Sequence, residues 1–517
     1  MFIHDYLEFY ARNIPDAPCV RQDNRVMTFK ELDQSANQLA NGLSAIGVQF
    51  GERIAILGEN SPEHYQVFMA ASKGGMVAVP LNYRLAAAEL AYIINDAKVK
   101  SLVVLAGMDA LLPGLTPLLD ADVKLLGVGV VGLDEFSLWM EGFSDDKPDV
   151  PLKDDDELIQ LYTSGTTGNP KGVVNSHRNV LALMTMNNTT APARGNAQTA
   201  GIVCAPLFHI GGAGSVFSGV YTGQQSLLHK MFNPVQVLDD FEAYPVEGLF
   251  MVPAMIAAIL QVPGVAQRDF SRLKQVYYGA SPISETVLRQ ALETFQCDFV
   301  QMYGMTETTG TVIALTAEDH QKALNGHPEL LRSAGRPSVG AKAKVLLSDG
   351  QEAAVGEVGE IAIRSDTNML GYFNLPEETA KTLVDGWVKT GDAGYINEQG
   401  YIFLKDRIKD MVVSGGENIY PVEVENTLAK HPAVLDVAVI GVPDEKFGEA
   451  LLAFVVLRDG ESLDCDAMIE FCRDKIAGYK IPRQLELIDE LPRNPSGKIL
   501  KKVLRAPYWE GKTRQIG

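Results

Sequence analysis

A run of hydroxyl, glycine and lysine residues from Thr163 to Gly172 constrains this chain more than any other stretch. It follows an apolar segment, Leu158 to Tyr162, which we interpret as a short strand. Glycines let a backbone take positive φ values and approach a ligand closely, and consecutive N–H groups in such a loop form a nest for an anion. Lys171 adds a positive charge, and four hydroxyls add hydrogen-bond donors: Thr163, Ser164, Thr166 and Thr167. The stretch is therefore interpreted as a phosphate-binding loop.

The spacing separates this loop from the Walker A type. Gly165, Gly168 and Lys171 are each three residues apart and Gly172 follows the lysine, so the G-x-x-x-x-G-K-[ST] pattern is not met. The plain alternative is a polar surface loop. The coincidence of hydroxyls, glycines and a lysine directly after a strand favours phosphate binding.

Length and composition limit the remaining possibilities. With 517 residues the chain is too long for one core and predicts two or more domains. Its 46% hydrophobic and 21% charged residues are ordinary for a globular protein. A net charge of −20 argues against nucleic acid or an anionic membrane as a general partner. It leaves room for a local anion site, because screening acts over about 8 Å at physiological salt.

Nothing in the sequence indicates export or a membrane span. The five cysteines show no CxxC or metal-ligand spacing, which favours reduced thiols and a cytoplasmic protein. Residues 1–12 lack the basic and apolar regions of a signal peptide. The most apolar stretch, residues 248–266, is interrupted by Pro253, Gln261 and Pro263. We expect a buried strand at 249–252 and a buried helix at 254–260 there.

The N-terminal part alternates between helical and strand patterns. Thr28-Phe29-Lys30-Glu31 is a capping box that opens a helix, and Pro62 can start a later one. Further segments alternate with these helices: strands at 53–57, 77–79 and 101–105, and a helix near 87–95. Such alternation predicts a parallel sheet with helices on both faces, an α/β fold. Residues 145–157 are acidic and carry prolines, as expected of a connector.

The last 110 residues or so have a different pattern. We expect helices at 422–430 and 467–476 and strands at 435–440 and 451–456, which together make a small α+β domain. Near its end, Lys498 follows a Pro-Ser-Gly turn. A lysine in that position is ordinarily a solvated loop tip.

The stretch from Leu161 to Val173 resembles the signature of the adenylate-forming (AMP-binding) superfamily, which includes acyl-CoA synthetases, luciferases and the adenylation domains of peptide synthetases. Further motifs extend the resemblance to Lys498, so it covers nearly the whole chain. It implies a large N-terminal adenylate-forming domain with parallel sheets and helices at residues 1–408. It also implies a small, mobile α+β lid domain at residues 409–517.

The resemblance assigns roles to individual residues of the large domain. His209, in Pro206-Leu207-Phe208-His209-Ile210-Gly211-Gly212, would lie between the acyl pocket and the nucleotide. The loop residues Ser164, Gly165, Thr166, Thr167 and Gly168 would bind phosphate, with Thr163 and Lys171 in catalytic positions. Gly279, Ala280 and Ser281 would line the adenine, next to Tyr303, Gly304 and Thr306. Glu307 would hold Mg²⁺, which needs only one or two protein carboxylates when phosphates are present.

The domain junction and the small domain carry the remaining assignments. Asp392, in Trp387-Val388-Lys389-Thr390-Gly391-Asp392, would accept from the ribose hydroxyls, and Arg407 would be a second ribose or phosphate contact. Lys409 would be the hinge, Gly415 and Gly416 a cofactor-binding loop, and Lys498 a catalytic lysine that reaches the active site. The ordinary alternatives for these residues are turn positions and surface charges.

The expected reaction is the joining of a carboxylic acid to coenzyme A. A carboxylate is a poor electrophile, so coupling it to AMP creates a good leaving group that the CoA thiol displaces. The enzyme must hold ATP, neutralise the departing pyrophosphate and exclude water. The expected ligands are ATP, Mg²⁺, CoA and a small carboxylic acid. A homodimer is possible, and nucleic acid is not expected as a partner. A carrier-loading adenylation domain, a luciferase and a non-catalytic nucleotide sensor are the alternatives.

The identity of the acid substrate is the part of the expected reaction that the sequence determines least. Gly211, Gly212 and Gly214 leave volume after His209, and no charged residue stands in that run. This favours a mainly apolar acyl group, expected to be a medium- or long-chain fatty acid. An aryl, cinnamate-like acid and a steroid-side-chain acid remain alternatives. The glycines could instead serve only the backbone shape of a loop.

Overall fold

The computed structural model describes residues 1–120, 123–163, 169–191, 196–281, 283–414, 417–444, 446–473, 475–493 and 499–510, without the side chains of Arg407, Lys409 and Asn418. The chain divides into two compact units. The first contains Met1–Lys342 with Ile363–Val388, and the second contains Ala343–Ala362 with Lys389–Gly517. The boundary between residues 408 and 409 expected from the sequence stays a prediction.

An eight-stranded sheet contains the N-terminal alternation. Its order is β19-β9-β8-β4-β3-β5-β6-β7. The strands from β8 to β7 pair in parallel, whereas β9 and β19 are antiparallel. The bounds in chain order are β3 Arg53–Leu57, β4 Val77–Leu81, β5 Val99–Leu105, β6 Lys124–Val128, β7 Asp134–Glu135, β8 Glu157–Thr163, β9 Lys171–Ser176 and β19 Gly371–Tyr372.

A nine-stranded sheet repeats this plan. Its order is β16-β15-β14-β13-β12-β10-β11-β1-β2, with a parallel centre from β1 to β14. Here too the last parallel strand, β14, turns into an antiparallel partner, β15. The bounds are β1 Pro18–Gln22, β2 Arg25–Thr28, β10 Ala200–Val203, β11 Gln225–Leu228, β12 Val246–Met251, β13 Gln275–Gly279, β14 Asp298–Met305, β15 Gly310–Leu315 and β16 Arg336–Pro337.

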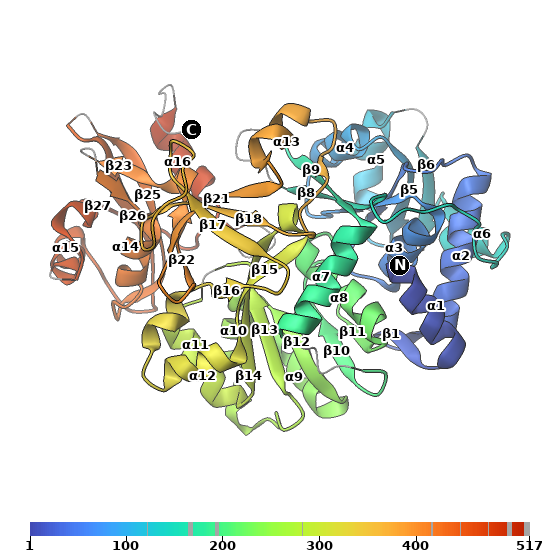
Figure 1. The fold of residues 1–517 in the computed structure, drawn as a ribbon, viewed down its shortest axis with the longest axis horizontal. Coiled ribbons are helices and arrows are strands. Elements are labelled where there is room, and N and C mark those ends of the chain that lie inside the picture. Colours follow the sequence, from blue (N-terminus) through green and yellow to red (C-terminus); the bar gives the residue numbers. More distant parts are fainter. Residues whose placement is uncertain are drawn as a thin grey trace. The chain divides into compact units, whose positions relative to one another are not determined.

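Helices cover these sheets, as the alternation predicted. Figure 1 shows α7 and α8 side by side over the nine-stranded sheet, and α8 contacts β10, β11 and β15. The helices of this unit are α1 Ile3–Asn13, α2 Phe29–Ala45, α3 Pro62–Gly74, α4 Ala87–Asp96, α5 Leu112–Leu115, α6 Phe136–Glu141, α7 His177–Thr190, α8 Ile210–Thr222, α9 Pro234–Ala243, α10 Pro253–Leu260, α11 Glu285–Phe295, α12 Ala317–Leu324 and α13 Pro376–Thr382.

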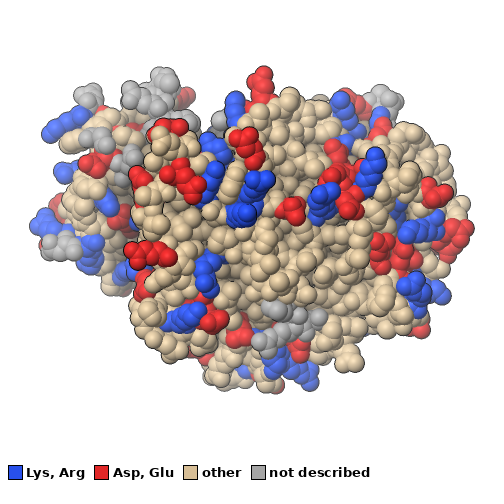
Figure 2. Space-filling view, viewed as in Figure 1, with Lys and Arg blue, Asp and Glu red and all other residues tan. Residues whose placement is uncertain are grey.

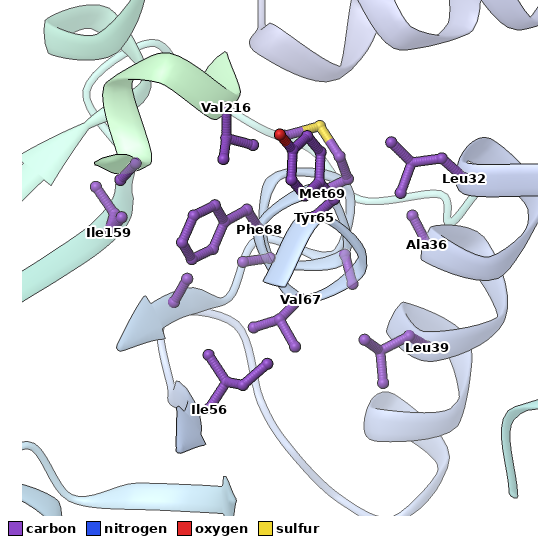
Figure 3. Packing of buried hydrophobic residues seen from close by; sticks show 14 of the residues in the cluster. Leu32, Ala36, Leu39, Ile56, Tyr65, Val67, Phe68, Met69, Ile159 and Val216 are labelled. Carbon is purple, nitrogen blue, oxygen red and sulfur yellow. The ribbon is translucent and has the colours of Figure 1, made fainter. Parts of the chain in front are cut away.

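The central helix α3 is buried on every side. All of its residues are buried, including Lys73, whose Nζ lies 2.7 Å from Asp33 and 3.1 Å from Glu8. A buried ammonium persists only when it is paired in this way. Figure 3 shows Phe68 of this helix among Ile56 of β3, Ile159 of β8 and Val216 of α8. The main core therefore joins elements from both sheets.

The second unit has the small α+β pattern expected of it. A five-stranded sheet, β24-β23-β26-β25 with β27 on β26, packs against α14, α15 and α16. The bounds are β23 Val412–Ser414, β24 Glu417–Ile419, α14 Pro421–Leu428, β25 Val434–Asp444, β26 Gly448–Leu457, α15 Cys465–Cys472, β27 Gln484–Leu487 and α16 Lys501–Trp509.

A further sheet has the order β17-β18-β21-β20, with β22 on β21. Its bounds are β17 Lys342–Leu346, β18 Gly359–Arg364, β20 Leu383–Val384, β21 Trp387–Ile396 and β22 Ile402–Arg407.

The local expectations are largely confirmed. The capping box at Thr28 is present, with the Glu31 amide donating to Thr28 Oγ1 and the Thr28 amide donating to Glu31. The apolar stretch at 248–266 is β12 followed by α10, as expected. Within the described ranges, no helix is long and apolar enough to cross a membrane. Figure 2 shows acidic and basic side chains interspersed on one face, around a broad uncharged area.

Candidate active site

The predicted phosphate loop joins two antiparallel strands. β8 ends at Thr163 and β9 begins at Lys171, and these two residues are register partners. The hairpin arrangement agrees with the sequence-based conclusion that the loop is not of the Walker A type, in which a helix follows the loop. The predicted phosphate ligands Ser164, Gly165, Thr166, Thr167 and Gly168 lie outside the described residues.

Lys171 is held at the base of this hairpin. Its Nζ lies 2.5 Å from Glu378 Oε2 and 5.0 Å from the centre of the Tyr372 ring. Lys171 and Lys381 lower the pKa of the Glu378 carboxyl to about 2. The lysine is therefore ion-paired with a carboxylate in this structure.

Glu307 lies in a second turn of the same kind, between β14 and β15. Its side chain is buried, and Tyr372 Oη donates to Glu307 Oε1 at 2.8 Å. Burial, followed by the charge of Glu307, raises the pKa of Tyr372. Glu307 Oε2 has no hydrogen-bond partner among the described residues and is not sealed from solvent. One carboxylate oxygen thus remains available, which fits a magnesium ion held mainly by phosphates.

Buried hydrogen bonds join the two turns. Asn175 of β9 donates to Thr309 Oγ1 at 2.7 Å, and Thr309 Oγ1 donates to the Thr367 carbonyl at 2.6 Å. The Met369 amide donates to the Glu307 carbonyl at 2.8 Å. Since β19 pairs with β9, Tyr372 meets both the lysine and the glutamate. The structure therefore brings together a cation and a carboxylate that lie far apart in the sequence.

The segments predicted to surround the adenine are also neighbours. Gly279 at the end of β13 is the register partner of Met302 in β14, one residue before Tyr303. A Cβ at Gly279 would lie 2.0 Å from the Met302 carbonyl oxygen, and one at Gly304 would lie 1.8 Å from that of Gly310. Both glycines are thus required by close backbone contact. Ala280 follows with φ +67, a left-handed conformation that is uncommon without glycine.

His209 is the N-cap residue of α8, and the centre of its ring lies 4.6 Å from that of Phe208 in a tilted arrangement. Burial, followed by the charge of Arg84, lowers the pKa of His209 to about 4. Its Nε2 is buried and has no hydrogen-bond partner among the described residues. A neutral imidazole with an unused nitrogen fits the predicted place of His209 beside a bound acid.

A cavity of about 220 Å³ lies between the nine-stranded sheet and helices α7 and α8. One face of α8 lines it, with residues spaced three or four apart, Gly211, Ser215, Ser218 and Thr222, and with Gly214 beside Ser215. Apolar walls come from other elements, including Leu183, Ile202, Leu249, Phe250 and Met302. Its outer end is at Ala280, Gly304 and Gly310, beside the two turns. Ligands of parallel sheets bind at these carboxyl ends of strands.

Two expectations about the glycines change. Gly211 to Gly214 belong to a helix, so they do not shape a loop. Gly212 does not line the cavity, because a Cβ there would lie 2.1 Å from the Pro206 carbonyl oxygen. Gly214 does line it, and a Cβ there would meet nothing within 4 Å.

In the second unit, Asp392 of β21 is the register partner of Arg407 of β22. The Asp392 amide donates to Thr390 Oγ1, which donates to the Ile361 carbonyl at 2.8 Å. The two predicted ribose contacts are thus adjacent in one sheet. Gly415, Gly416 and Lys498 lie outside the described residues, as do the side chains of Arg407 and Lys409.

The sequence did not single out Tyr372, Glu378 or Asn175. Each acts through pairing between segments that are distant in the chain, and no local pattern marks such residues. Within the described ranges, no group of three or more His, Cys, Asp or Glu side chains could hold a metal ion.

Comparison with known proteins agrees with this geometry. Residues 7–373 match the model of the AMP-binding enzyme family, and residues 423–498 match the AMP-binding enzyme C-terminal domain. The chain belongs to the AMP-binding enzyme family. It is accordingly an AMP-forming acid–thiol ligase, which joins an acid to a thiol through an acyl-adenylate.

Individual relatives differ in their acids and thiols. The chain is 36% identical over 515 residues to the fatty acid–[acyl-carrier-protein] ligase ScoC of Streptomyces coeruleorubidus, covering 98% of this chain and 96% of that protein. It is 37% identical over 502 residues to a feruloyl-CoA synthase of an Amycolatopsis species, covering 96% and 97%. The Bacillus subtilis o-succinylbenzoate CoA synthetase bound to its acyl-adenylate has a TM-score of 0.84 and 29% identity, covering 96% and 97%.

Proposed function

We propose that this protein is an acid–CoA ligase that converts a carboxylic acid, ATP and CoA into acyl-CoA, AMP and pyrophosphate. The observation that carries the proposal is the convergence of Lys171 and Glu307 on Tyr372, with Glu307 in the turn whose flanking residues Gly304 and Gly310 line the cavity. A phosphate chain beside Lys171 and an acid in the cavity would bring the carboxylate to the α-phosphate.

Each residue of the first unit has a distinct part in this scheme. Lys171 and the Ser164–Gly168 loop bind the phosphates and stabilise the charge that develops as pyrophosphate leaves. Glu307 holds Mg²⁺, which neutralises phosphate charge. His209 stays neutral near pH 7, so it orients the acid by hydrogen bonding without adding a charge that would hold the carboxylate back.

The second unit supplies the remaining groups. Asp392 and Arg407 bind the ribose, Lys498 acts in adenylation, and the Gly415–Gly416 loop serves the thioester step. Lys409 is the hinge between domains 1–408 and 409–517. Support for these roles comes from the family membership and from the pairing of Asp392 with Arg407.

The volume of the cavity limits which acids can be substrates. Ligand pockets commonly enclose about 300–1,000 Å³, and this one encloses about 220 Å³. We therefore favour a medium-chain fatty acid over a long-chain acid and over a steroid-side-chain acid. An aryl, cinnamate-like acid is the second candidate, since polar side chains also line the cavity and one relative is a feruloyl-CoA synthase.

The test is pyrophosphate release with ATP and Mg²⁺ across acetate, hexanoate, octanoate, palmitate and cinnamates, with CoA present or absent. We expect CoA-dependent turnover and acyl-CoA as product, with octanoate or a cinnamate ahead of palmitate. Transfer to an acyl-carrier protein but not to CoA would refute the choice of thiol. No pyrophosphate release with any acid would refute the proposal.

The described cysteines are all unpaired, which suits a reducing compartment. We therefore propose a cytoplasmic location, which fractionation of the native cell would test.

A further inference from the structure

The cavity changes character between its two ends. Its outer end lies at the carboxyl ends of β13 and β14, near Ala280 and Gly304. Its inner end lies where these parallel strands begin, near Gln275. Along α8 it extends from Gly211 to Thr222, about 16 Å at 1.5 Å per residue. An acid with its carboxylate at the outer end therefore places its distal end beside Gln275.

The floor of the inner end is a row of register partners across four strands. Ser226, Gly201, Gly248 and Gln275 are adjacent in β11, β10, β12 and β13, and all four line the cavity. A Cβ at Gly201 would lie 2.8 Å from Gln224 Oε1, and one at Gly248 would lie 3.2 Å from the Gln275 carbonyl oxygen, so both glycines have close neighbours. Gln224 and Gln275 are the large polar side chains that border this end, and Gln224 donates its Nε2 to Thr199 Oγ1. Gln275 as a whole residue is only 5% exposed to solvent.

In the side-chain amide of Gln275, the oxygen Oε1 accepts a hydrogen bond, whereas the nitrogen Nε2 makes none among the described residues. Tyr277 Oη donates to Gln275 Oε1 at 2.7 Å and lies 3.3 Å from the Ala191 carbonyl oxygen. This bond fixes the amide so that Nε2 remains as the donor. Among the described residues Nε2 has no hydrogen-bond partner, and it is not sealed from solvent-sized space. The adjacent open space is the cavity.

The surroundings define what Nε2 can bind. Asn187 and Ser218 also line the cavity, and neither side chain has a hydrogen-bond partner among the described residues. Glu247 lines the cavity, and its negative charge disfavours a distal carboxylate on the acid. A plain alkyl terminus is disfavoured too, because it would strip water from the Gln275 donor and give nothing in return.

We propose that Gln275 selects acids that carry a neutral oxygen substituent, such as a hydroxyl, at the end distal to the carboxylate. The inference rests on the proposed function and specifies its substrate. Tyr277 acts as a positioning residue, since it holds the Gln275 amide in the donating orientation. The apolar walls bind the body of the acid, which is either an aromatic ring or an alkyl chain.

The test compares two matched pairs of acids: 4-hydroxycinnamate with cinnamate, and 8-hydroxyoctanoate with octanoate. For the wild-type protein we expect the hydroxylated member of one pair to have a kcat/KM about tenfold higher, as a buried hydrogen bond allows. Gln275→Leu should lower this ratio about tenfold. Tyr277→Phe should lower it about threefold, and this variant preserves the packing if Gln275→Leu fails to fold. The pair that responds identifies the body of the acid.

Gln225→Leu is the matched control. Gln225 precedes Ser226 in β11, its side chain lies on the other face of the sheet, and it does not line the cavity. This variant should leave the ratio as in the wild type. The proposal is overturned if the wild type prefers both unsubstituted acids, or if Gln275→Leu lowers both members of a pair equally.

Calorimetric titration of the acids without CoA separates this inference from the proposed function. Selective binding of the hydroxylated acid, lost in Gln275→Leu, upholds the inference even when pyrophosphate is not released. Turnover without any selectivity upholds the function and refutes the inference.

Discussion

Gly214 and Gly212 are two residues apart on α8 but have opposite surroundings. A Cβ at Gly214 meets nothing within 4 Å, whereas one at Gly212 would lie 2.1 Å from a backbone oxygen. The indole of Gly214→Trp should therefore fill part of the cavity. Each methylene of the acid that can no longer be buried there costs about 0.8 kcal/mol of binding free energy. We expect kcat/KM to fall at least tenfold more for palmitate or octanoate than for acetate, measured by pyrophosphate release.

Gly212→Ala is the contrasting variant. It should destabilise the protein by about 1–3 kcal/mol because the carbonyl of Pro206 cannot move without disturbing the start of α8. Its effect on different acids should be uniform. An equal loss for all acids in a folded Gly214→Trp protein would remove Gly214 from the acyl site.

Lys498 provides a second test at the residue scale. Its charge is expected to serve adenylation, where charge develops on the leaving phosphate, and removal of one such group commonly costs about 10²–10³ in rate. Lys498→Ala should form acyl-adenylate slowly and still transfer a supplied acyl-adenylate to CoA. The two half-reactions are measured separately, and equal losses in both would contradict the assignment.

At the scale of elements, α13 is coupled to the phosphate hairpin through Glu378. The Lys171 ammonium is paired with this carboxylate, and in the proposed function the phosphates of ATP replace Glu378 as its partner. Ion pairs at exposed positions are weak and are screened by salt, so the competition with ATP is small. Glu378→Ala should therefore lower KM for ATP about twofold to threefold in low-salt buffer.

Glu377→Ala is the control on the same helix, because Glu377 is exposed and no ion pair joins it to Lys171. Raising the salt concentration should bring the wild type and Glu378→Ala together, as screening weakens the pair. A rise in KM for ATP in Glu378→Ala would show instead that the glutamate positions Lys171 for catalysis.

The helices and strands also show which features of the fold could be predicted from the sequence. The strand before the phosphate loop, the helix opened by the capping box at Thr28 and the β12–α10 pair follow local patterns, and all were predictable. Lys171 and Glu307 were identified by motif. Their meeting at Tyr372 was not predictable, because it depends on β19 pairing with β9. Gln275 was missed for the same reason, since the cavity floor exists only in the register of four strands.

At the scale of the whole molecule, buried histidines should govern stability in mild acid. Burial lowers the pKa of His64, His177 and His209 to about 4 and that of His4 to about 2. In the unfolded chain a histidine has a pKa of about 6.5. Between these values the unfolded chain binds protons that the folded protein does not, so the free energy of unfolding falls as pH is lowered from 6.5 towards 4.

The size of this effect can be tested at His177. Its side chain is buried, and neither ring nitrogen has a hydrogen-bond partner among the described residues. The gap between a pKa of 6.5 and about 4 corresponds to about 3 kcal/mol of unfolding free energy, as an order of magnitude. His177→Phe keeps a ring beside Phe2 and removes the titration. Urea unfolding between pH 7 and pH 4.5 should show a shallower loss of stability in this variant than in the wild type.

His327→Phe, at an exposed histidine, serves as the control and should follow the wild type. Parallel curves for His177→Phe and the wild type would mean that His177 takes up its proton without unfolding the protein, and that the acid lability originates elsewhere.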